Sequence, residues 1–456
     1  MRPPAVKITF SGDDLCLLGV EERFLEDIPF IKDQKKLLTY PCFLDIILKK
    51  LHQKNIPVES KLALKHPLTI PLDPQFELRA FQKEAFEKWK EKGRGTLILP
   101  TGSGKTFLGM QAVSELKQAT LIVVPTIDLV DQWRSNLQQL GLSEKSIGQY
   151  GGGTQKLAPI TVSTYESARI YLHRFRTRTG LIIFDEVHHL SGERWLSIAQ
   201  GMIAPFRMGL TATLGNDHPA FEEIEQFVGP ILFSMTPREL RELGHVASYI
   251  IKRLPVPLSE SEKEEYIAHR STYLQYLRRT GLNRARNPYQ ELLYRAYEPE
   301  ARAALAAHRQ ARALQFNARE KTQLVREILR KHPGEKSLIF SESVSFAERV
   351  SRELLIPVIT GKTPSEERRA VLAGFRKGLL RVLATSRVLD EGVDVPDASV
   401  GIIVSGSAQV RQFIQRLGRI LRPVPKKESA ILYEIISSGT GEEDVSRRRK
   451  DGLEEA

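Results

Sequence analysis

The sequence predicts an α/β protein with two parallel-sheet domains, a small α/β domain in front of them and one helical insertion. Three observations lead to this prediction. Short apolar runs rich in branched residues alternate with helical patterns over 76–245, and a second series of this kind begins near residue 320. Between them, 259–318 is rich in Glu, Ala, Leu, Arg and Gln, which is a helical composition. Alternation of strands with helices is typical of βαβ units, whose parallel strands are buried on both faces.

Composition limits the classes of function. The chain has 456 residues, enough for about three domains of roughly 150 residues each. Its 67 Lys and Arg residues against 55 Asp and Glu residues give a formal charge of +12. A surplus of this sign favours a polyanionic partner such as nucleic acid or an anionic membrane, and a basic protein without such a partner is the alternative. The content of 41% apolar and 27% charged residues excludes a wholly disordered chain.

The sequence also bears on location. No apolar run is long enough to span a bilayer, and the N-terminus lacks the cationic start and apolar stretch of a secretory signal. The two cysteines, Cys16 and Cys42, match no metal-binding spacing and cannot form a disulfide framework. We therefore expect a cytoplasmic protein, associated with the nucleoid or, in a eukaryote, located in the nucleus.

The first 72 residues form a separate block. Phe43–His52 has helical apolar spacing, and the proline-rich Lys65–Pro74 has little periodicity, which predicts a linker. We predict a small α/β domain over 1–72, to which the residues themselves assign no chemistry.

The two larger domains are predicted over 76–245 and 246–456, with two or three helices inserted in the second over 259–318. The expected strands of the first are Thr96–Leu99, Thr120–Val124, Ile160–Thr164, Leu181–Phe184 and Met208–Leu210. Those of the second are Ser337–Phe340, Pro357–Ile359, Arg381–Ala384, Val400–Val404 and Ala430–Ile435. Over 251–330 there are 16 basic and 9 acidic residues. Seven excess positive charges thus lie in and around the insertion, where a solvated helix face is the simpler explanation.

A glycine-rich loop follows the strand Thr96–Leu99 and precedes a helical stretch. Its glycines allow a tight turn in which several N–H groups face one anion, and the helix N-terminus adds positive potential. The residues of this phosphate-binding loop are Thr101, Gly102, Ser103, Gly104, Lys105 and Thr106. We expect Lys105 to reach the β and γ phosphates of ATP, and Thr106 to ligate Mg²⁺.

Two acidic residues, Asp185 and Glu186, follow the strand Leu181–Phe184. The carboxyl ends of parallel strands meet at the edge of the sheet where ligands bind. Asp185 is expected to hold Mg²⁺ through water, and Glu186 to orient or deprotonate an attacking water.

On these and later motifs the chain resembles a DExH-box helicase of superfamily 2. Asp185–His188 reads Asp-Glu-Val-His, and the motifs that follow keep the order of that family. The closer resemblance, over about 76–450, is to the XPB branch in its short prokaryotic form. The segments that carry it are Asp185–Leu190, Ala204–Thr213, Val388–Pro396 and Gln415–Pro423.

The resemblance implies two RecA-like motor domains, a helical thumb at 259–318 and a damage-recognition role for 1–72. It implies an ATP-dependent DNA helicase or translocase of DNA repair or transcription-linked DNA opening, moving 3′ to 5′. The cofactors would be ATP and Mg²⁺. The partners would be DNA at junctions between single strands and duplex, and a nuclease or repair-complex protein. The motor would act as a monomer.

The resemblance also assigns roles to residues besides Lys105, Asp185 and Glu186. Adenine contacts are expected from Arg79 and Gln82, and coupling of the nucleotide to DNA from His188, Thr211, Ala212 and Thr213. In the second domain, nucleotide contacts are expected from Gly392 and Asp394, and catalytic contacts with the γ-phosphate from Gln415, Arg419 and Arg422. DNA contacts are expected from Pro125, Thr126, Thr164, Tyr165 and Thr385, and from Arg278, Arg279, Arg284 and Arg286 of the thumb. The interleaved thumb tyrosines, Tyr266, Tyr273, Tyr276 and Tyr294, are expected to pack in the thumb, with base stacking as the alternative.

One departure from the family leaves the mode of action open. The Arg-Glu-Asp triplet that helps the family to separate strands is replaced here by Asn216, Asp217 and His218. The chain could therefore be a duplex translocase that does not separate strands and works with a nuclease. An RNA helicase and a non-catalytic nucleic-acid clamp are two further hypotheses, and the intact catalytic residues argue against the clamp.

Overall fold

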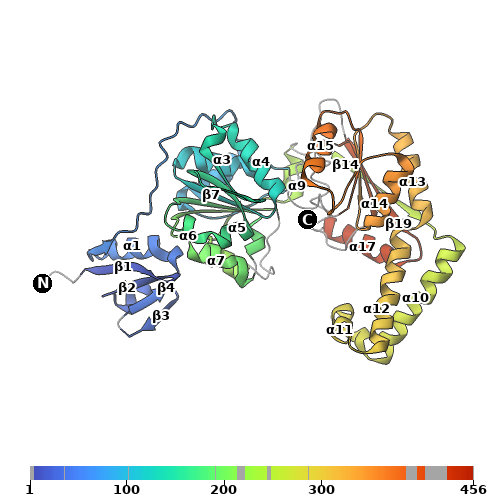
Figure 1. Cartoon of the computed structure of the whole chain (residues 1–456), viewed down its shortest axis with the longest axis horizontal. Coiled ribbons are helices and arrows are strands. Elements are labelled where there is room, and N and C mark those ends of the chain that lie inside the picture. Colours follow the sequence, from blue (N-terminus) through green and yellow to red (C-terminus); the bar gives the residue numbers. More distant parts are fainter. Residues whose placement is uncertain are drawn as a thin grey trace. The chain divides into compact units, whose positions relative to one another are not determined.

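A computed structural model describes residues 5–34, 36–100, 102–190, 192–212, 221–243, 248–285, 287–386, 398–405 and 429–454. The chain divides into two compact units, one ending at Leu240 and the other beginning at Arg241 (Figure 1). Among the described residues, no helix has both the length and the apolar character needed to cross a membrane.

The first unit begins with a small five-stranded sheet in the order β3-β4-β2-β1-β5. Its strands are β1 (Val6–Ser11), β2 (Asp14–Leu18), β3 (Phe30–Asp33), β4 (Lys36–Thr39) and β5 (Val58–Ser60). β1 and β5 are parallel, and the other pairs are antiparallel. The helix α1 (Leu44–Gln53) has the apolar spacing that the sequence predicts, and it buries Leu44, Ile47 and Leu51.

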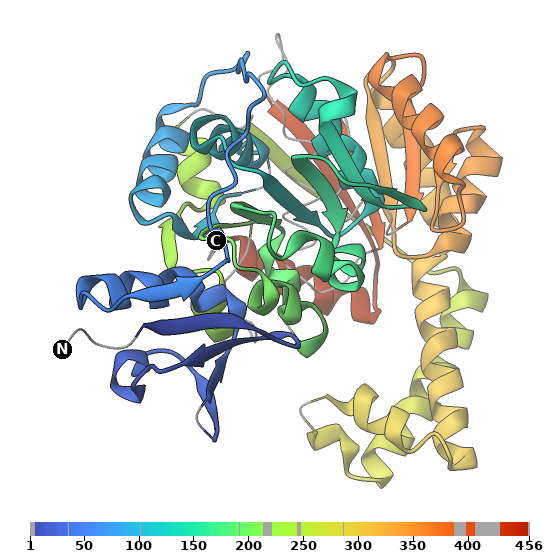
Figure 2. The same ribbon diagram turned by 60° about the vertical axis from the view of Figure 1, so that its left-hand side comes forward.

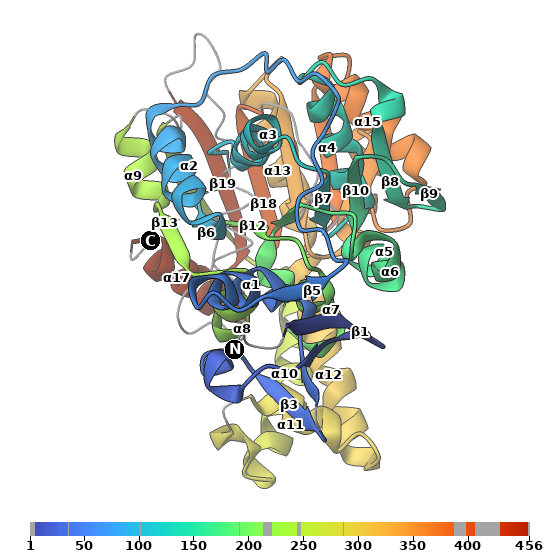
Figure 3. The ribbon, with the colours of Figure 1, turned by 90° about the vertical axis from the view of Figure 1, so that its left-hand side faces the viewer.

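This small domain packs firmly on the sheet domain that follows it. The Tyr40 and Phe43 rings lie 5.4 and 6.0 Å from the Phe227 ring, measured between centroids. Arg176 donates to the carboxylate of Asp13 at 2.5 Å. Between the two domains, the segment after β5 runs along the sheet domain to α2, as Figure 3 shows, and its Leu68 N–H donates to Lys117 O.

The sheet of the first large domain has the order β13-β6-β12-β11-β7-β10-β8-β9, and only β8 and β9 are antiparallel. Its strands are β6 (Arg94–Ile98), β7 (Thr120–Val124), β8 (Ile147–Gly151), β9 (Thr154–Lys156), β10 (Ile160–Thr164), β11 (Leu181–Asp185), β12 (Phe206–Thr211) and β13 (Ile231–Ser234). Its helices are α2 (Ala80–Lys92), α3 (Lys105–Leu116), α4 (Ile127–Gln138), α5 (Tyr165–Ile170), α6 (Leu172–Phe175), α7 (Glu193–Gly201), α8 (Phe221–Phe227) and α9 (Pro237–Glu242). The predicted parallel α/β class is confirmed, whereas β8, β9 and β13 were not predicted.

The strand order explains why the motifs meet. Adjacent strands β6, β12, β11, β7 and β10 all end at one edge of the sheet. That edge therefore carries, in spatial order, the phosphate loop, the Thr-Ala-Thr segment, the acidic pair and the helices α4 and α5. These segments lie far apart in the sequence.

The second unit contains a parallel sheet in the order β14-β19-β18-β15-β17-β16. Its strands are β14 (Ser248–Val256), β15 (Ser337–Ser341), β16 (Val358–Ile359), β17 (Val382–Ser386), β18 (Val400–Ser405) and β19 (Ser429–Ser437). The helices beside the sheet are α13 (Arg319–Lys331), α14 (Val344–Leu354), α15 (Ser365–Arg376) and α17 (Gly441–Glu454). The edge strand β14 was not predicted.

Three helices lie between β14 and α13 and project away from this sheet (Figure 2). They are α10 (Glu260–Arg279), α11 (Pro288–Tyr294) and α12 (Pro299–Phe316). Their own small core holds Tyr276, Leu292 and Leu305. Ser259 caps α10 with a capping box that includes Glu262. We call α10–α12 the thumb.

A buried arginine ties the first sheet to the ends of two helices. Arg207 in β12 is completely buried. Its guanidinium donates to Ala199 O, Met202 O, Ala204 O and Phe227 O at 2.5–3.1 Å. Several of these carbonyls belong to the last turns of α7 and α8 and have no helical partner of their own.

Replacing this arginine tests its structural role. Arg207→Met should lower the free energy of unfolding by about 3–5 kcal/mol, because the carbonyls of Ala199, Met202 and Ala204 lose this donor and Phe227 O keeps only Arg94, at 3.3 Å. Unfolding in urea is followed by tryptophan fluorescence. This signal reports on the first unit, which contains Arg207, because Trp89, Trp133 and Trp195 all lie there. Arg194→Met, which removes an exposed ion pair with Glu166, should cost less than about 1 kcal/mol. Equal losses in the two variants would contradict this account.

Candidate active site

The phosphate loop has the conformation of an anion cradle. Gly102 and Gly104 have φ values of 85° and 81°, in the left-handed region that favours glycine. α3 begins at Lys105, directly after Gly104. The Ser103 hydroxyl is buried and has no hydrogen-bond partner among the described residues. Within the same part of the chain, Lys105 Nζ donates only to Leu99 O, at 3.2 Å. Unused donors in a glycine-rich turn at a helix N-terminus fit the phosphates of ATP.

Gln82 holds this loop in place. Its amide nitrogen donates to Ser103 O at 2.7 Å, and its amide oxygen accepts from Arg79 N–H at 2.8 Å. A Cβ atom on Gly104 would lie 2.7 Å from the Gln82 amide nitrogen, so the close approach requires glycine. The structure therefore shows Gln82 engaged with the loop, whereas the exposed Arg79 keeps its side chain available for the predicted adenine contact.

Asp185, the last residue of β11, is buried under two aromatic side chains. Trp133 Nε1 donates to its carboxylate at 2.8 Å, and the Glu186 N–H donates to the other oxygen at 3.1 Å. Burial and the neighbouring Glu186 raise the pKa of Asp185 to about 6, while Trp133 and Lys105 oppose the rise. A divalent cation would favour the ionised form, so this carboxylate fits the Mg²⁺ site that the sequence predicts.

Glu186 has an unusual backbone for a residue with a side chain. Its φ of 53° lies in the left-handed region, a conformation that costs non-glycine residues about 1–3 kcal/mol and occurs often at functional sites. Its Oε2 atom is buried and accepts no hydrogen bond from the described residues. The nearest cation-forming group is His188, whose Nδ1 lies 3.5 Å away. A carboxylate oxygen without a donor is suited to accept a proton from water.

His188 connects the acidic pair to the next strand. Its Nδ1 lies 2.9 Å from the hydroxyl of Thr211, the last residue of β12, and both side chains are buried. The predicted coupling residues His188 and Thr211 are thus in direct contact, and Ala212 follows them at the surface of the same edge.

The predicted DNA contacts of the first domain fall into two groups. Thr126 and Thr164 are the N-caps of α4 and α5 and, like Pro125, are partly exposed at the sheet edge. Tyr165 is different, because its side chain is 1% exposed and its hydroxyl donates to Asp185 O at 3.1 Å. The prediction that the Tyr165 side chain contacts DNA is corrected: the side chain is buried against the acidic pair.

In the second unit, Thr385 lies in β17 with only 1% of its surface exposed. Its hydroxyl has no partner in the described part of the chain. An unused hydroxyl at the carboxyl end of a strand remains compatible with a phosphate contact, which stays a prediction.

Of the predicted DNA-contacting arginines of the thumb, Arg278, Arg279 and Arg284 lie in the described ranges and are exposed. Arg279 is paired with Glu300, while Arg278 and Arg284 make no ion pair within the described ranges. The thumb tyrosines divide: Tyr266 and Tyr276 are buried, as predicted, but Tyr294 is 70% exposed. Packing therefore does not account for Tyr294.

Several predicted residues lie outside the described residues. They are Thr101, Thr213, Arg286, Gly392, Asp394, Gln415, Arg419 and Arg422, and also Asn216, Asp217 and His218. Their roles stay predictions from the sequence.

Two features of the site were missed from the sequence. Trp133 gave no signal, because one tryptophan within an amphipathic helix is usually a core residue. An aromatic pair also lies beside the phosphate loop, where the Phe76 ring packs 5.1 Å from the partly exposed Phe107 ring. Phe76 lies three residues before Arg79 in the sequence. This proximity to the predicted adenine-contact segment could have indicated that Phe76 lies near the phosphate loop.

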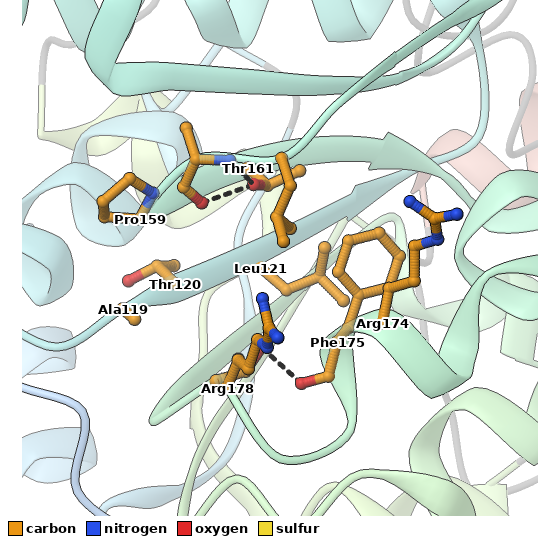
Figure 4. Close-up of a pocket in the computed structure, with 11 residues that line it drawn as sticks. Ala119, Thr120, Leu121, Pro159, Thr161, Arg174, Phe175 and Arg178 are labelled. Carbon is orange, nitrogen blue, oxygen red and sulfur yellow. Dashed lines mark hydrogen bonds between the residues drawn. The ribbon is translucent and has the colours of Figure 1, made fainter.

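The first sheet domain also has a cavity of about 270 Å³ at the opposite edge of the sheet, where β7 and β10 begin. Figure 4 shows Arg174 and Arg178 at its margin and Leu121 and Phe175 on its wall. Because the acidic pair and the phosphate loop lie at the other ends of the strands, this cavity is not part of the site.

Comparisons with known proteins agree with this geometry. Residues 75–216 match the family model "Type III restriction enzyme, res subunit", and 320–424 match "Helicase conserved C-terminal domain". The chain is 40% identical to a DNA 3′-5′ translocase XPB2 of Sulfurisphaera tokodaii, over 89% of this chain and 91% of that protein. It is 29% identical to a DNA 3′-5′ helicase XPB of Mycobacterium tuberculosis, over 86% of this chain and 66% of that protein. The Hef helicase domain of Pyrococcus furiosus shares the fold, with a TM-score of 0.54 at 20% identity over 81% of this chain and 98% of that one.

The isolated carboxylate of Glu186 can be tested directly. Glu186→Gln should lower ATP turnover by about 10²–10⁴-fold, the usual contribution of a general base, and leave ATP affinity within about tenfold. Steady-state hydrolysis and equilibrium binding of ATP measure the two effects. Glu144→Gln removes an exposed carboxylate of the same domain and should change neither. Normal turnover by Glu186→Gln would show that this residue is not the base.

Proposed function

The chain belongs to the XPB family of superfamily 2 DNA helicases and translocases, and we propose that it couples ATP hydrolysis to 3′-to-5′ movement along DNA in repair or in transcription-linked DNA opening. The observation that carries the proposal is the arrangement at one sheet edge. The phosphate loop, the acidic pair and the two capped helices α4 and α5 lie there on adjacent strands.

The residues of the first domain divide the chemistry of phosphoryl transfer among them. The loop N–H groups and Lys105 would bind the phosphates of ATP, and Thr106 and Asp185 would hold Mg²⁺. A bound Mg²⁺ supplies neutralisation of charge on the phosphates. Glu186 would orient the attacking water and accept its proton, and His188 would carry the state of the site to Thr211.

The second domain would complete the site in this proposal. Arg419 and Arg422 are spaced three residues apart in the sequence, a spacing that would place both on one face if the segment is helical. As arginine fingers they would stabilise the charge that develops on the γ-phosphate, with Gln415 beside it. Gly392 and Asp394 would contact the nucleotide. Because hydrolysis would need residues of both motor domains, each catalytic cycle would require the two domains to close.

DNA would be held through its backbone. Thr126 and Thr164, with Pro125 beside them and Thr385 in the second domain, would contact phosphates of the tracked strand. The exposed thumb arginines Arg278 and Arg284 would hold the duplex backbone, together with Arg279 and Arg286. Contacts of this kind carry no sequence readout.

Tyr294 and Tyr297 give the thumb a second means of contact. Both are more than two-thirds exposed, at 70% and 76%. Arg302 donates to the carbonyls of Ala296 and Tyr297 and so fixes the turn between α11 and α12. Exposed aromatic rings on a fixed turn beside arginines would stack on unpaired bases.

A protein partner would determine where the motor acts. We propose a nuclease or another repair protein as this partner, a monomeric motor, and a cytoplasmic or nucleoid location. The related protein of Dictyostelium discoideum carries the name of a subunit of general transcription and DNA repair factor IIH.

The proposed function is tested by ATPase rates with single-stranded, duplex and forked DNA and with RNA, each at two salt concentrations. DNA should stimulate hydrolysis well above RNA, and the stimulation at subsaturating DNA should fall as salt rises. Stronger stimulation by RNA would favour an RNA helicase. Parallel assays of fork unwinding and triplex displacement address the altered triplet at Asn216, Asp217 and His218. Triplex displacement without fork unwinding would identify a duplex translocase.

The thumb contacts are tested by Arg278→Ala combined with Arg284→Ala. Each lost phosphate contact should reduce the slope of log affinity against log salt by about 0.9 for duplex DNA, so the double variant should lose about 2. Arg330→Ala with Lys331→Ala removes the same charge from the end of α13, which lies outside the thumb, and should leave the slope nearly unchanged. An equal loss in both pairs would mean that only net charge matters.

A further inference from the structure

Two helices that begin at the proposed DNA-contacting edge also contact the acidic pair, one at a carboxylate and the other at backbone carbonyls. α4 begins after Thr126, and its Trp133 donates to the Asp185 carboxylate at 2.8 Å. α5 begins after Thr164, and its first residue, Tyr165, donates to Asp185 O at 3.1 Å, with Glu186 O at 3.5 Å. The residue that caps α5 and the residue that bonds the acidic pair are therefore neighbours in the chain.

Glu186 needs such support. With φ at 53°, its backbone lies in a conformation that side-chain-bearing residues keep only when their surroundings enforce it. Three contacts hold its peptide groups. The Glu186 N–H donates to Asp185 Oδ1, the His189 N–H donates to Glu186 O at 3.0 Å, and the Tyr165 hydroxyl donates to Asp185 O with Glu186 O 3.5 Å away. Tyr165 supplies the one side-chain donor among these three contacts, so its loss would leave the turn held by backbone N–H groups alone.

The hydroxyl of Tyr165 is itself rigidly placed. Its ring is stacked on Phe184 and packs against Trp195 and His189, with centroid distances of 5.5–6.5 Å. Because interiors are closely packed, a shift of α5 moves the hydroxyl with it.

We propose that Tyr165 is a positioning residue for Glu186 and that it transmits the DNA-bound state of the Thr164 edge to ATP hydrolysis. The inference rests on the proposed function. It adds a second connection between bound DNA and the ATP site, besides the one proposed through the His188–Thr211 contact. A strand phosphate bound at Thr164 would fix the N-terminus of α5, and the rigid ring would then fix the Glu186 carbonyl in the geometry for hydrolysis. Trp133 would anchor the Asp185 carboxylate from α4 in the same way.

The test compares Tyr165→Phe with Tyr171→Phe, two variants that lose one hydroxyl each and keep their rings. Tyr171 is the C-cap of α5, and its hydroxyl accepts from Gln155, outside the acidic pair. For each variant, kcat and KM for ATP are measured without DNA and at saturating duplex DNA, together with duplex affinity and the thermal midpoint.

Tyr165→Phe should lower the DNA-stimulated kcat about tenfold or more, and lower the ratio of stimulated to basal kcat. KM for ATP, duplex affinity and the thermal midpoint should stay close to those of the wild type, which a loss of folding would not allow. Tyr171→Phe should match the wild type throughout.

Three outcomes would overturn the inference. One is wild-type stimulation in Tyr165→Phe, and another is an equal loss of basal and stimulated kcat together with a higher KM and a lower thermal midpoint. Weakened duplex affinity with an unchanged stimulated kcat would return Tyr165 to the role of a DNA contact. A wild-type protein that DNA does not stimulate would refute the proposed function itself, and with it the relay, so the two failures are distinguishable.

Discussion

The burial of the Asp185 carboxylate at the end of β11 is the constraint around which the first sheet domain is arranged. Burial and the adjacent Glu186 disfavour its charged form, and its pKa is raised to about 6. The protein offsets this with hydrogen bonds from Trp133 Nε1 and from a backbone N–H. Above pH 6 the carboxylate is ionised at a cost to stability, and a divalent cation would relieve that cost. A divalent cation at this position, as proposed for Mg²⁺, would therefore stabilise the ionised carboxylate.

The position of β11 in the sheet gives the acidic pair two sets of neighbours. On one side β12 presents Thr211 to His188, and β6 beyond it carries the phosphate loop. On the other side β7 and β10 lead into α4 and α5, which present Trp133 and Tyr165. The pair therefore has a neighbour on each side: His188, which contacts Thr211, lies 3.5 Å from Glu186 Oε2, and Trp133 and Tyr165 donate to Asp185. The order of parallel strands, and not nearness in sequence, creates this connection.

Much of the fold could be predicted because buried parallel strands leave a strong local pattern. The runs at Thr120–Val124 and Ile160–Thr164 coincide with β7 and β10 residue for residue. The edge strand β9 was missed because all three of its residues are polar and exposed, so it has no apolar run. The edge strands β13 and β14 were also missed, although their sequences are largely apolar. For the site, residues whose chemistry is carried by spacing, such as Lys105 and Asp185, were predictable. Trp133 was given no role and Tyr165 was expected to contact DNA, because which atom an aromatic side chain bonds depends on helix packing that one sequence does not display.

In the thumb, the formal excess of positive charge is larger than the number of cations that are free to contact a polyanion. Seven excess positive charges lie over 251–330, yet many of its arginines already have partners: Arg279 with Glu300, Arg312 with Glu342, and Arg302 with two backbone carbonyls. Arg278 and Arg284 are exposed and make no ion pair in the part of the chain that the structure describes. A motor must release its track in every cycle, so a few exposed cations suit it better than a continuous basic surface would. In the proposed function, the exposed arginines rather than the paired ones would make the salt-sensitive contacts.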